Sequence, residues 1–292
     1  QLRMWLDRLL QYVGAESRAL GEMYSFLPIS FSSRAVARVG AIEGIEGTEL
    51  ALAELADRFI IEHIGDRRWR MHQLVAHSIR ETVAPTDRQR ILKVLAWDQI
   101  LGTGLPTRPA ESVDSVRKGL TAVSLLRRAQ DFATASLVAN ACAAAAKRSG
   151  SYRMFVDAAK PVALAYSPVD DWLRYHIAHC HLVVGEPRRG LSALSHAKEH
   201  RDQVLRLSSA RLRSELLFEL GDSDRALSLL RNAFSNALPE LERSHRASIA
   251  LSQAGLALAK QEATQGNFDR AERQLHVVEG LGPPSPIATG VG

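Results

Sequence analysis

The sequence lacks the short motifs by which many enzymes are recognised. It contains no G-x-x-x-x-G-K-[ST] phosphate loop, no G-x-S-x-G nucleophile elbow and no H-E-x-x-H pair. Gly40, Gly44 and Gly47 form a local glycine series, but no lysine follows them to complete a phosphate loop. We therefore predict that this chain has no catalytic residues and cannot hydrolyse a nucleotide unaided.

Cysteines and long apolar runs are also scarce. Cys142 and Cys180 lie far apart without a CxxC neighbour, which gives no disulfide framework and fits a reducing cytoplasm. We expect each cysteine to be a buried small apolar residue. Charged residues interrupt every apolar run before the roughly 18 residues that a membrane span requires. The sequence therefore predicts a cytoplasmic protein without a membrane partner.

Aromatic residues make up only 6% of the 292-residue chain, whereas 46% of its residues are hydrophobic. Such a composition suits helices that pack through small and aliphatic side chains. The net charge of +5 permits a nucleic-acid partner, but basic and acidic residues alternate along most of the chain, as on solvated helix faces. We predict an all-α fold with room for two modest domains.

The first 84 residues combine helical periodicity with one short β-hairpin. Helices are predicted near residues 2–13, 16–26, 32–40, 48–58 and 72–82. Between the last two, the pattern predicts a strand at 59–64, a turn at 65–67 and a second strand at 69–71. Helices followed by a hairpin and a closing helix form the order of a winged-helix-like domain.

Winged helices often bind DNA through their third helix, which here would be 48–58. That helix carries Glu49, Glu54 and Asp57, whose negative charge opposes a phosphate-rich partner. Arginines on the hairpin could contact a nucleic-acid backbone, but such residues are common on exposed turns. The sequence therefore argues against direct nucleic-acid binding.

A short motif at the end of the hairpin points to a family. The stretch 53–61, leading into 69–75, resembles the winged-helix subdomain of STAND signalling ATPases of the NB-ARC class, and the resemblance covers about residues 20–82. In that family a methionine–histidine–aspartate motif ends the hairpin, and its histidine contacts the β-phosphate of bound ADP. Met71 and His72 match the first two positions, and Gln73 stands in place of the aspartate. The resemblance implies that His72 binds ADP held by an upstream nucleotide-binding domain.

The residues allow two interpretations of His72. A histidine at a strand-to-helix junction can offer a ring N–H to an anion, aided by the helix N-terminus beside it. Alternatively, His72 caps its own helix or packs locally. The chain itself offers no other cofactor residue, so any ADP or ATP would belong to a longer parent protein.

One turn pattern recurs in the second half of the chain, at residues 130–135, 185–190, 221–226 and 266–271. In each, a glycine or polar residue closes one helix, an acidic or amide residue caps the next, and a small residue lets the two helices approach closely. This turn resembles the centre of the tetratricopeptide repeat, whose period is about 34 residues. Because the spacing is uneven, with an extra helix near 152–166, we predict an irregular, right-handed TPR-like superhelix with a concave face lined by first helices.

Glycine and proline mark the predicted domain boundaries. A helix near 87–100 is followed by a Gly/Pro-rich joint, and the last residues form a Gly/Pro-rich tail. The predicted plan is a winged-helix-like domain at 1–84, a bridging helix and joint at 85–112, a TPR-like repeat domain at 113–281 and an irregular tail at 282–292.

Aligning Gly185 with the turn of the repeat predicts a partner-binding groove on two successive first helices. Its residues are Trp172, Tyr175, His179, Arg211, Glu215 and Phe218. Aromatic side chains with an arginine nearby are typical of interaction hot spots, so a protein or peptide ligand is the expected occupant. The alternative is that Trp172 and Tyr175 belong to the core.

Histidines are dense near the same helix. His176, His179 and His181 could be joined by His196 and His200, and paired imidazoles on helices can bind zinc. The set has no established zinc spacing, and His181 falls at a core position of the repeat. We predict no metal site.

Three functions remain open on the sequence. In the first, the chain is the regulatory and sensor arm of a bacterial STAND-type ATPase used in signalling, transcription regulation or defence. The pattern starts directly at Gln1 without a charged leader, so we expect an upstream part of a longer protein. The second function is a freestanding TPR scaffold for protein interactions. The third is a regulator that binds nucleic acid directly.

Overall fold

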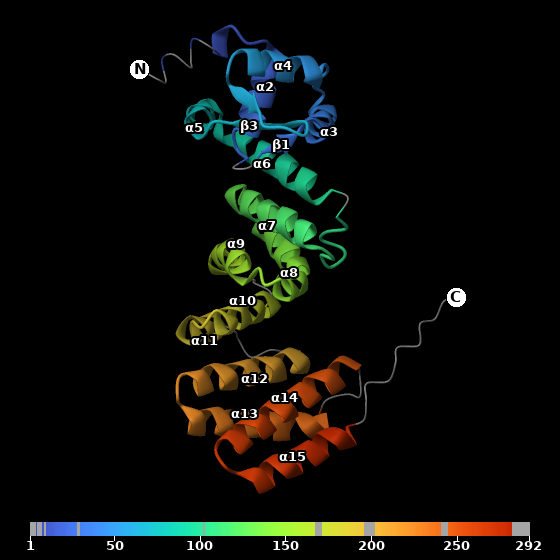
Figure 1. The fold of residues 1–292 in the computed structure, drawn as a ribbon, viewed down its shortest axis with the longest axis vertical. Helices are drawn as coiled ribbons and strands as arrows, with labels where there is room; N and C mark the ends of the chain where they lie inside the picture. Colours follow the sequence, from blue (N-terminus) through green and yellow to red (C-terminus); the bar gives the residue numbers. More distant parts are fainter. Residues whose placement is uncertain are drawn as a thin grey trace, which may run out of the picture. The chain divides into compact units, whose positions relative to one another are not determined.

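The computed structural model describes residues 4, 8, 10–27, 30–101, 103–166, 171–195, 202–240 and 245–281. The described chain is mainly helical, with one small antiparallel sheet (Figure 1). This confirms the predicted fold class, all-α with a small β element. Half of the predicted 2–13 helix, the tail at 282–292, and His196 and His200 lie outside the described residues.

The chain divides into two compact units, Gln1–Ala145 and Ala146–Gly292, and each is described by itself. The predicted domain boundaries at residues 84 and 112 stay predictions. The described helices include none that is both long and apolar enough to cross a bilayer.

The first unit opens with three helices that surround an aliphatic core: α2 (Ala15–Tyr24), α3 (Ser33–Glu43) and α4 (Thr48–Asp57). The Ser32 hydroxyl caps α3 by accepting a hydrogen bond from the Ala35 backbone N–H at 3.1 Å. Gly44 ends the same helix at a φ of 67°, a conformation that favours glycine. Helix α4 packs against both α2 and α3, and Leu20 of α2 and Leu55 of α4 are fully buried.

A three-stranded antiparallel sheet follows, with strands β1 (Phe31–Ser32), β2 (Ile61–His63) and β3 (Arg68–Met71) in the order β1-β3-β2. The predicted hairpin is confirmed as β2 and β3, with Met71 opposite Ile61. The sequence did not predict β1, where Phe31 pairs with Trp69. Two residues are too few to show the alternation of a strand, so only pairing with β3 reveals it.

Four further helices begin in the first unit: α5 (Gln73–Thr82), α6 (Pro85–Ile100), α7 (Val113–Arg128) and α8 (Phe132–Arg148). Pro85 occupies the first turn of α6, where its missing N–H costs no hydrogen bond. α6 packs against α2, α3 and α7. Helices α7 and α8 approach closely at Gly119, which has no side chain. A β-carbon at this position would lie only 2.4 Å from the buried Cys142 sulfur.

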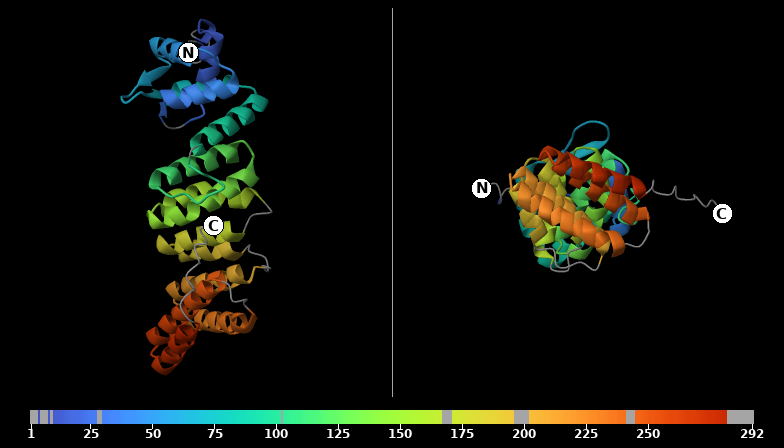
Figure 2. Two further views of the ribbon diagram at one scale, coloured as in Figure 1. Left: turned by 90° about the vertical axis from the view of Figure 1, so that its right-hand side faces the viewer. Right: turned by 90° about the horizontal axis from the view of Figure 1, so that it is seen from below.

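The second unit contains α9 (Tyr152–Ala165) and then helices in successive pairs. The pairs are α10 (Asp171–Val183) with α11 (Pro187–Ser195), α12 (Gln203–Glu219) with α13 (Ser223–Glu240), and α14 (His245–Thr264) with α15 (Phe268–Gly280). Neighbouring pairs pack on each other in chain order (Figure 2). This arrangement confirms a TPR-like helical fold.

The recurrent turn explains how the helices of a pair come together. Gly185, Gly221 and Gly266 all have φ values between 76° and 83°, where a side chain would be strained. The small residue five positions after each glycine is buried: Gly190, Ala226 and Ala271. A β-carbon on Gly190 would lie 3.1 Å from the Ala178 carbonyl oxygen of α10 and 2.7 Å from a Leu216 methyl group of α12, so a larger residue would require these neighbours to shift.

Candidate functional site

His72 follows the buried Met71 at the end of β3 and forms the N-cap of α5. Its Nδ1 accepts a hydrogen bond from the Leu74 backbone N–H at 3.3 Å. A neutral imidazole whose Nδ1 accepts carries its proton on Nε2. The exposed ring thus caps its helix, as one interpretation predicted, and still has an N–H to offer to an anion. Contact of His72 with a phosphate stays a prediction.

The charged groups expected to decide nucleic-acid binding take part in contacts within the first unit. Glu54 accepts hydrogen bonds from the Ser17 hydroxyl at 2.5 Å and from the Gly14 backbone N–H at 3.2 Å. The pKa of Glu54 is lowered, and the hydrogen bond from Ser17 is the largest cause. On the hairpin, Arg70 pairs with Glu62 at 2.6 Å. These contacts leave α4 acidic and compensate one of the hairpin arginines.

The predicted groove residues on α10 and α12 are brought together around Tyr175. The Tyr175 hydroxyl accepts a hydrogen bond from Arg211 Nη2 at 3.0 Å, and Arg211 Nη1 binds Glu215 Oε1 at 2.7 Å. The ring of Tyr175 is only 7% exposed and packs against leucines such as Leu194 and Leu212. Tyr175 therefore has a core ring and a polar tip that is held from the next first helix.

Trp172, Tyr175, His176 and His179 form a continuous set of rings on α10, which we call the aromatic strip. The Trp172 and Tyr175 rings meet edge to face with centroids 5.6 Å apart, and the Tyr175 and His179 centroids lie 6.4 Å apart. Arg246 of α14 lies 5.5 Å from the centre of the Trp172 ring. Phe218 is half-buried two turns beyond Arg211 on α12.

Burial keeps the imidazoles of the aromatic strip neutral. It lowers the pKa of His176 to about 3 and that of His179 to about 4, with the nearby Lys147 adding to both shifts. Among the described residues, nothing within hydrogen-bonding distance satisfies the buried Nδ1 of His179. Neutral rings can accept hydrogen bonds that protonated rings could not.

Sequence reasoning missed Lys147, which contacts the aromatic strip from the end of α8. Its ammonium lies 3.4 Å from His176 Nδ1 and 5.9 Å from the centre of the Tyr175 ring. Burial lowers the pKa of Lys147. The sequence marks Lys147 only as a basic residue in the last turn of α8, and such residues are common at helix ends. The extra helix α9 also separates Lys147 from α10 along the chain. With Arg211 and Arg246, Lys147 gives the strip a cationic border that Glu215 only partly offsets.

The histidine-rich segment does not assemble a metal centre within the described residues, which include no cluster of three potential metal ligands. His181 is buried, and its Nδ1 lies 2.9 Å from Glu186 Oε2. This contact joins the end of α10 to the turn before α11. His181 therefore fills a core position of the repeat, as its register predicted.

Comparison with known proteins adds one distant likeness. No protein-family model and no curated protein sequence matches the chain. One similar solved structure is the Signal Transduction ATPase with Numerous Domains (STAND) protein with a tetratricopeptide repeat sensor from Pyrococcus horikoshii, at 13% identity and a TM-score of 0.43. The match covers 96% of this chain and 46% of that one, so this chain spans less than half the length of the archaeal protein.

Proposed function

We propose that this chain is the non-catalytic regulatory and sensor arm of a STAND-type ATPase. Its first part would latch an upstream nucleotide-binding domain in the ADP-bound state, and its helical pairs would bind a protein or peptide trigger in the cytoplasm. The observation that carries the proposal is the geometry of His72. This ring caps α5 through Nδ1, is exposed, and follows the Met-His pair that resembles the family motif.

The proposed latch depends on one hydrogen bond and one helix terminus. The Nε2–H of His72 would donate to the β-phosphate of ADP, and the N-terminus of α5 beside it favours negative charge. The hydrogen bond from the Leu74 N–H to Nδ1 fixes the tautomer that this role requires. ADP and ATP would be held by the parent protein's nucleotide-binding domain, because this sequence has no phosphate loop.

The proposed sensor surface is the aromatic strip with the residues that border it. Aromatic rings and arginines are enriched at interaction hot spots. Lys147, Arg211 and Arg246 favour a partner that presents acidic groups beside apolar ones. A trigger that binds better to the open state would shift the population away from the state in which His72 holds ADP.

The latch is tested by His72→Ala in the full-length parent protein. We expect about tenfold faster release of bound ADP, because a hydrogen bond to a charged group contributes roughly 1.5 kcal/mol or more. The measurement is the release of labelled ADP after dilution into unlabelled nucleotide.

His77→Ala provides the matched control, since His77 is exposed on the same helix and, among the described residues, its ion-pair partner is Glu81 at 3.5 Å. This variant should release ADP at the wild-type rate. Equal release from the His72 and His77 variants would contradict the latch.

A freestanding TPR scaffold is the second candidate. One observation favours it: the aromatic strip and the described residues that contact it all lie in the second compact unit. The two candidates differ in what lies upstream of Gln1 in the parent protein. A phosphate loop there supports the sensor arm, and its absence supports the scaffold.

A further inference from the structure

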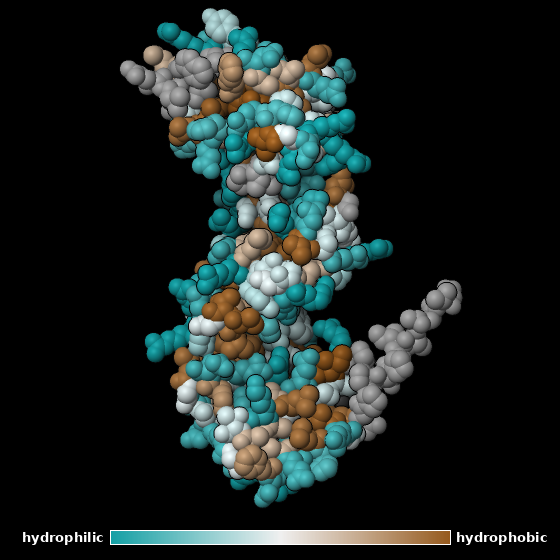
Figure 3. All heavy atoms as spheres, viewed as in Figure 1, coloured by the Kyte–Doolittle hydropathy of each residue, from teal (hydrophilic) through white to brown (hydrophobic). Residues whose placement is uncertain are grey.

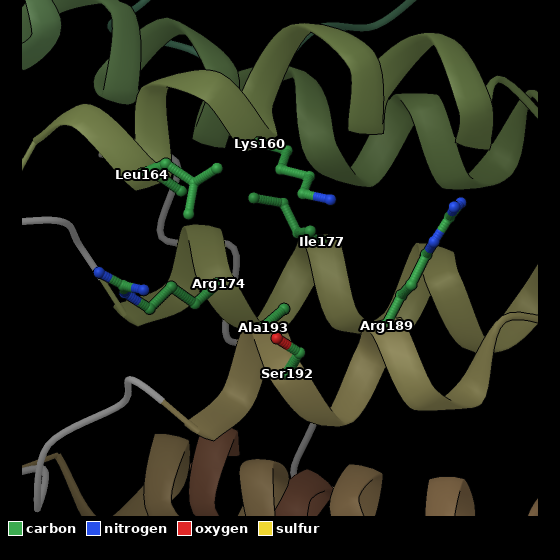
Figure 4. A pocket seen from close by; sticks show the side chains of 8 residues that line it. Lys160, Leu164, Arg174, Ile177, Arg189, Ser192 and Ala193 are labelled. Atoms are coloured by element: carbon green, nitrogen blue, oxygen red, sulfur yellow. The ribbon is translucent and has the colours of Figure 1, made fainter.

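A pocket separate from the aromatic strip lies between α9, α10 and α11 (Figure 4). It has a volume of about 90 Å³ and is lined by Lys160, Ala163, Leu164, Arg174, Ile177, Arg189, Ser192 and Ala193. On α10, Arg174 and Ile177 each follow a residue of the aromatic strip by two positions, which is about 200° around a helix. This α9–α11 pocket is therefore on the other side of α10 from the strip.

The floor of the α9–α11 pocket is apolar and is made largely of small side chains. Ile177 and Ala163 are buried, and Ala193 is half-buried beside them. Because Ala163 and Ala193 have small side chains, they leave open a volume that leucines at the same positions would fill. Leu164 adds an exposed apolar edge, and hydrophobic patches also gather on the visible surface of this unit (Figure 3). The floor can thus bury the apolar body of a small molecule.

The charged side chains that the structure describes in the lining of this pocket are all positive. Lys160 extends from α9, and Arg189 rises from α11 toward α9 on one side of the pocket (Figure 4). Arg174 lies on the opposite side, with its guanidinium directed toward the edge of the pocket. Among the described residues, the pocket lining contains no carboxylate. Arg189 is compensated by Glu186 at 2.8 Å, but no described acidic residue pairs with Lys160. Charge complementarity therefore favours an anion.

Arg174 is the least exposed of these cations. Its side chain is only 15% exposed, and its nearest described carboxylate is Asp171 at 3.9 Å, which is too long for a hydrogen bond. Among the described residues, none accepts a hydrogen bond from its guanidinium. A buried charge without such partners costs stability, and a bidentate carboxylate would satisfy two donors at once.

An adjoining cavity of about 480 Å³ shares Lys160 and Arg189 with the α9–α11 pocket. It gives room for a ligand longer than the pocket alone could hold. Asp157 and Glu186 line this cavity together with Arg153, Lys160 and Arg189, so it offers groups of both charges. The carboxylate of a ligand is expected at Arg174, which is the least exposed of the three pocket cations, and a longer body would extend into the adjoining cavity.

We propose that the α9–α11 pocket binds a small organic carboxylate with an apolar body. The carboxylate pairs with Arg174, Lys160 adds attraction, and the apolar body covers Ala163, Ile177 and Ala193. The site lies wholly in the second unit and does not depend on the proposed latch or on the aromatic strip. Its ligand would be a second input to the helical pairs, distinct from a protein trigger.

The test is calorimetric titration of the 292-residue chain with octanoate, 1-octanol and octylamine, which share one apolar body and differ in charge. We expect saturable binding of octanoate at one site per chain and at least tenfold weaker binding of the other two compounds. Equal binding of all three would overturn the proposal, because it would indicate apolar adsorption. Binding of a glutamate-rich peptide in place of octanoate would also overturn it, in favour of a peptide site.

Variants then assign the site. Arg174→Gln should weaken octanoate binding about tenfold or more, and Arg174→Lys should weaken it less because the charge remains. Ala193→Leu should abolish binding by filling the floor, with circular dichroism showing whether the variant is folded. Octanoate affinity that is unchanged in Arg174→Gln would overturn the proposal.

Arg225→Gln is the matched control for charge. Arg225 occupies in α13 the same turn position that Arg189 occupies in α11, and the two side chains are 73% and 65% exposed. Removing the Arg225 charge lowers the net charge of the chain without touching the pocket. Wild-type octanoate affinity is expected, and a loss equal to that of Arg174→Gln would contradict site-specific binding.

Discussion

The Arg38–Asp98 pair of the first unit and the aromatic strip of the second both place titratable side chains in the interior, but the burial is compensated differently. Asp98, whose side chain is 2% exposed, accepts hydrogen bonds from Arg38 Nε at 3.0 Å and Nη2 at 2.7 Å. Burial raises the pKa of Asp98, and Arg38 opposes that rise. In the strip, by contrast, the histidines stay neutral. A paired buried charge holds two helices together, whereas neutral rings bordered by cations are suited to binding.

The largest expected effect comes from removing the arginine of each region. Arg38→Met leaves Asp98 buried without its partner and should lower the free energy of unfolding by about 3 kcal/mol. Arg211→Met leaves the Tyr175 hydroxyl unsatisfied but frees Glu215 to reach water, so we expect a loss of only about 1 kcal/mol. Urea denaturation measures both values. A larger loss in Arg211→Met would show that the strip is also a stability element.

A pH dependence confined to the second unit is the next largest effect. His176 and His179 have folded pKa values of about 3 and 4, below their ordinary 6.5. As pH falls from 6.5 toward 4, the unfolded chain gains protons that the folded chain does not, so stability is full above pH 6.5 and declines below it.

We expect a loss on the order of 2 kcal/mol in this window. The measurement is hydrogen exchange of α10 amides between pH 6.5 and 5, with α4 amides of the first unit as the internal control because the pKa of Glu54 on α4 is lowered. Equal changes in both helices would remove the contrast between the two regions.

The smallest effect concerns one turn position that the two units fill differently. Gln130 in the first unit has a φ of 59°, where the corresponding turns of the second unit have glycine, as at Gly185 with a φ of 76°. Gln130→Gly should stabilise the chain by about 0.5–1 kcal/mol, and Gly185→Gln should destabilise it by about 1 kcal/mol. Thermal unfolding measures both changes. Destabilisation by Gln130→Gly would show that the Gln130 side chain makes a contact worth more than the backbone strain.

The local chemistry of the turns and hairpin was predictable from the sequence because each depends on neighbouring residues. Gly185, Gly221 and Gly266 marked helix ends that the structure confirms, and the glycine–aspartate–arginine turn marked the hairpin. The β1 strand was not predictable, because its two residues form a strand only by pairing with β3 (Arg68–Met71), which is distant in sequence.

The candidate site shows the same division. Periodicity placed Tyr175 and Arg211 on first helices, and the structure brings their side chains within a hydrogen bond. No sequence pattern joined Lys147 to them, because the intervening α9 breaks the repeat. Nor could it predict the α9–α11 pocket, whose lining comes from three helices and whose volume depends on how alanines pack.

By itself, the sequence determined helix content, the turn glycines, the hairpin and the Met71–His72 pair, since these depend on local backbone preference and short-range spacing. Only the tertiary structure decided that the His72 ring caps α5 with one nitrogen and leaves the other outward. It also decided that burial makes the strip histidines neutral and that Arg174 lies beside an apolar floor without a hydrogen-bonding partner among the described residues. Burial and partner geometry are properties of packed helices, and no single segment carries them.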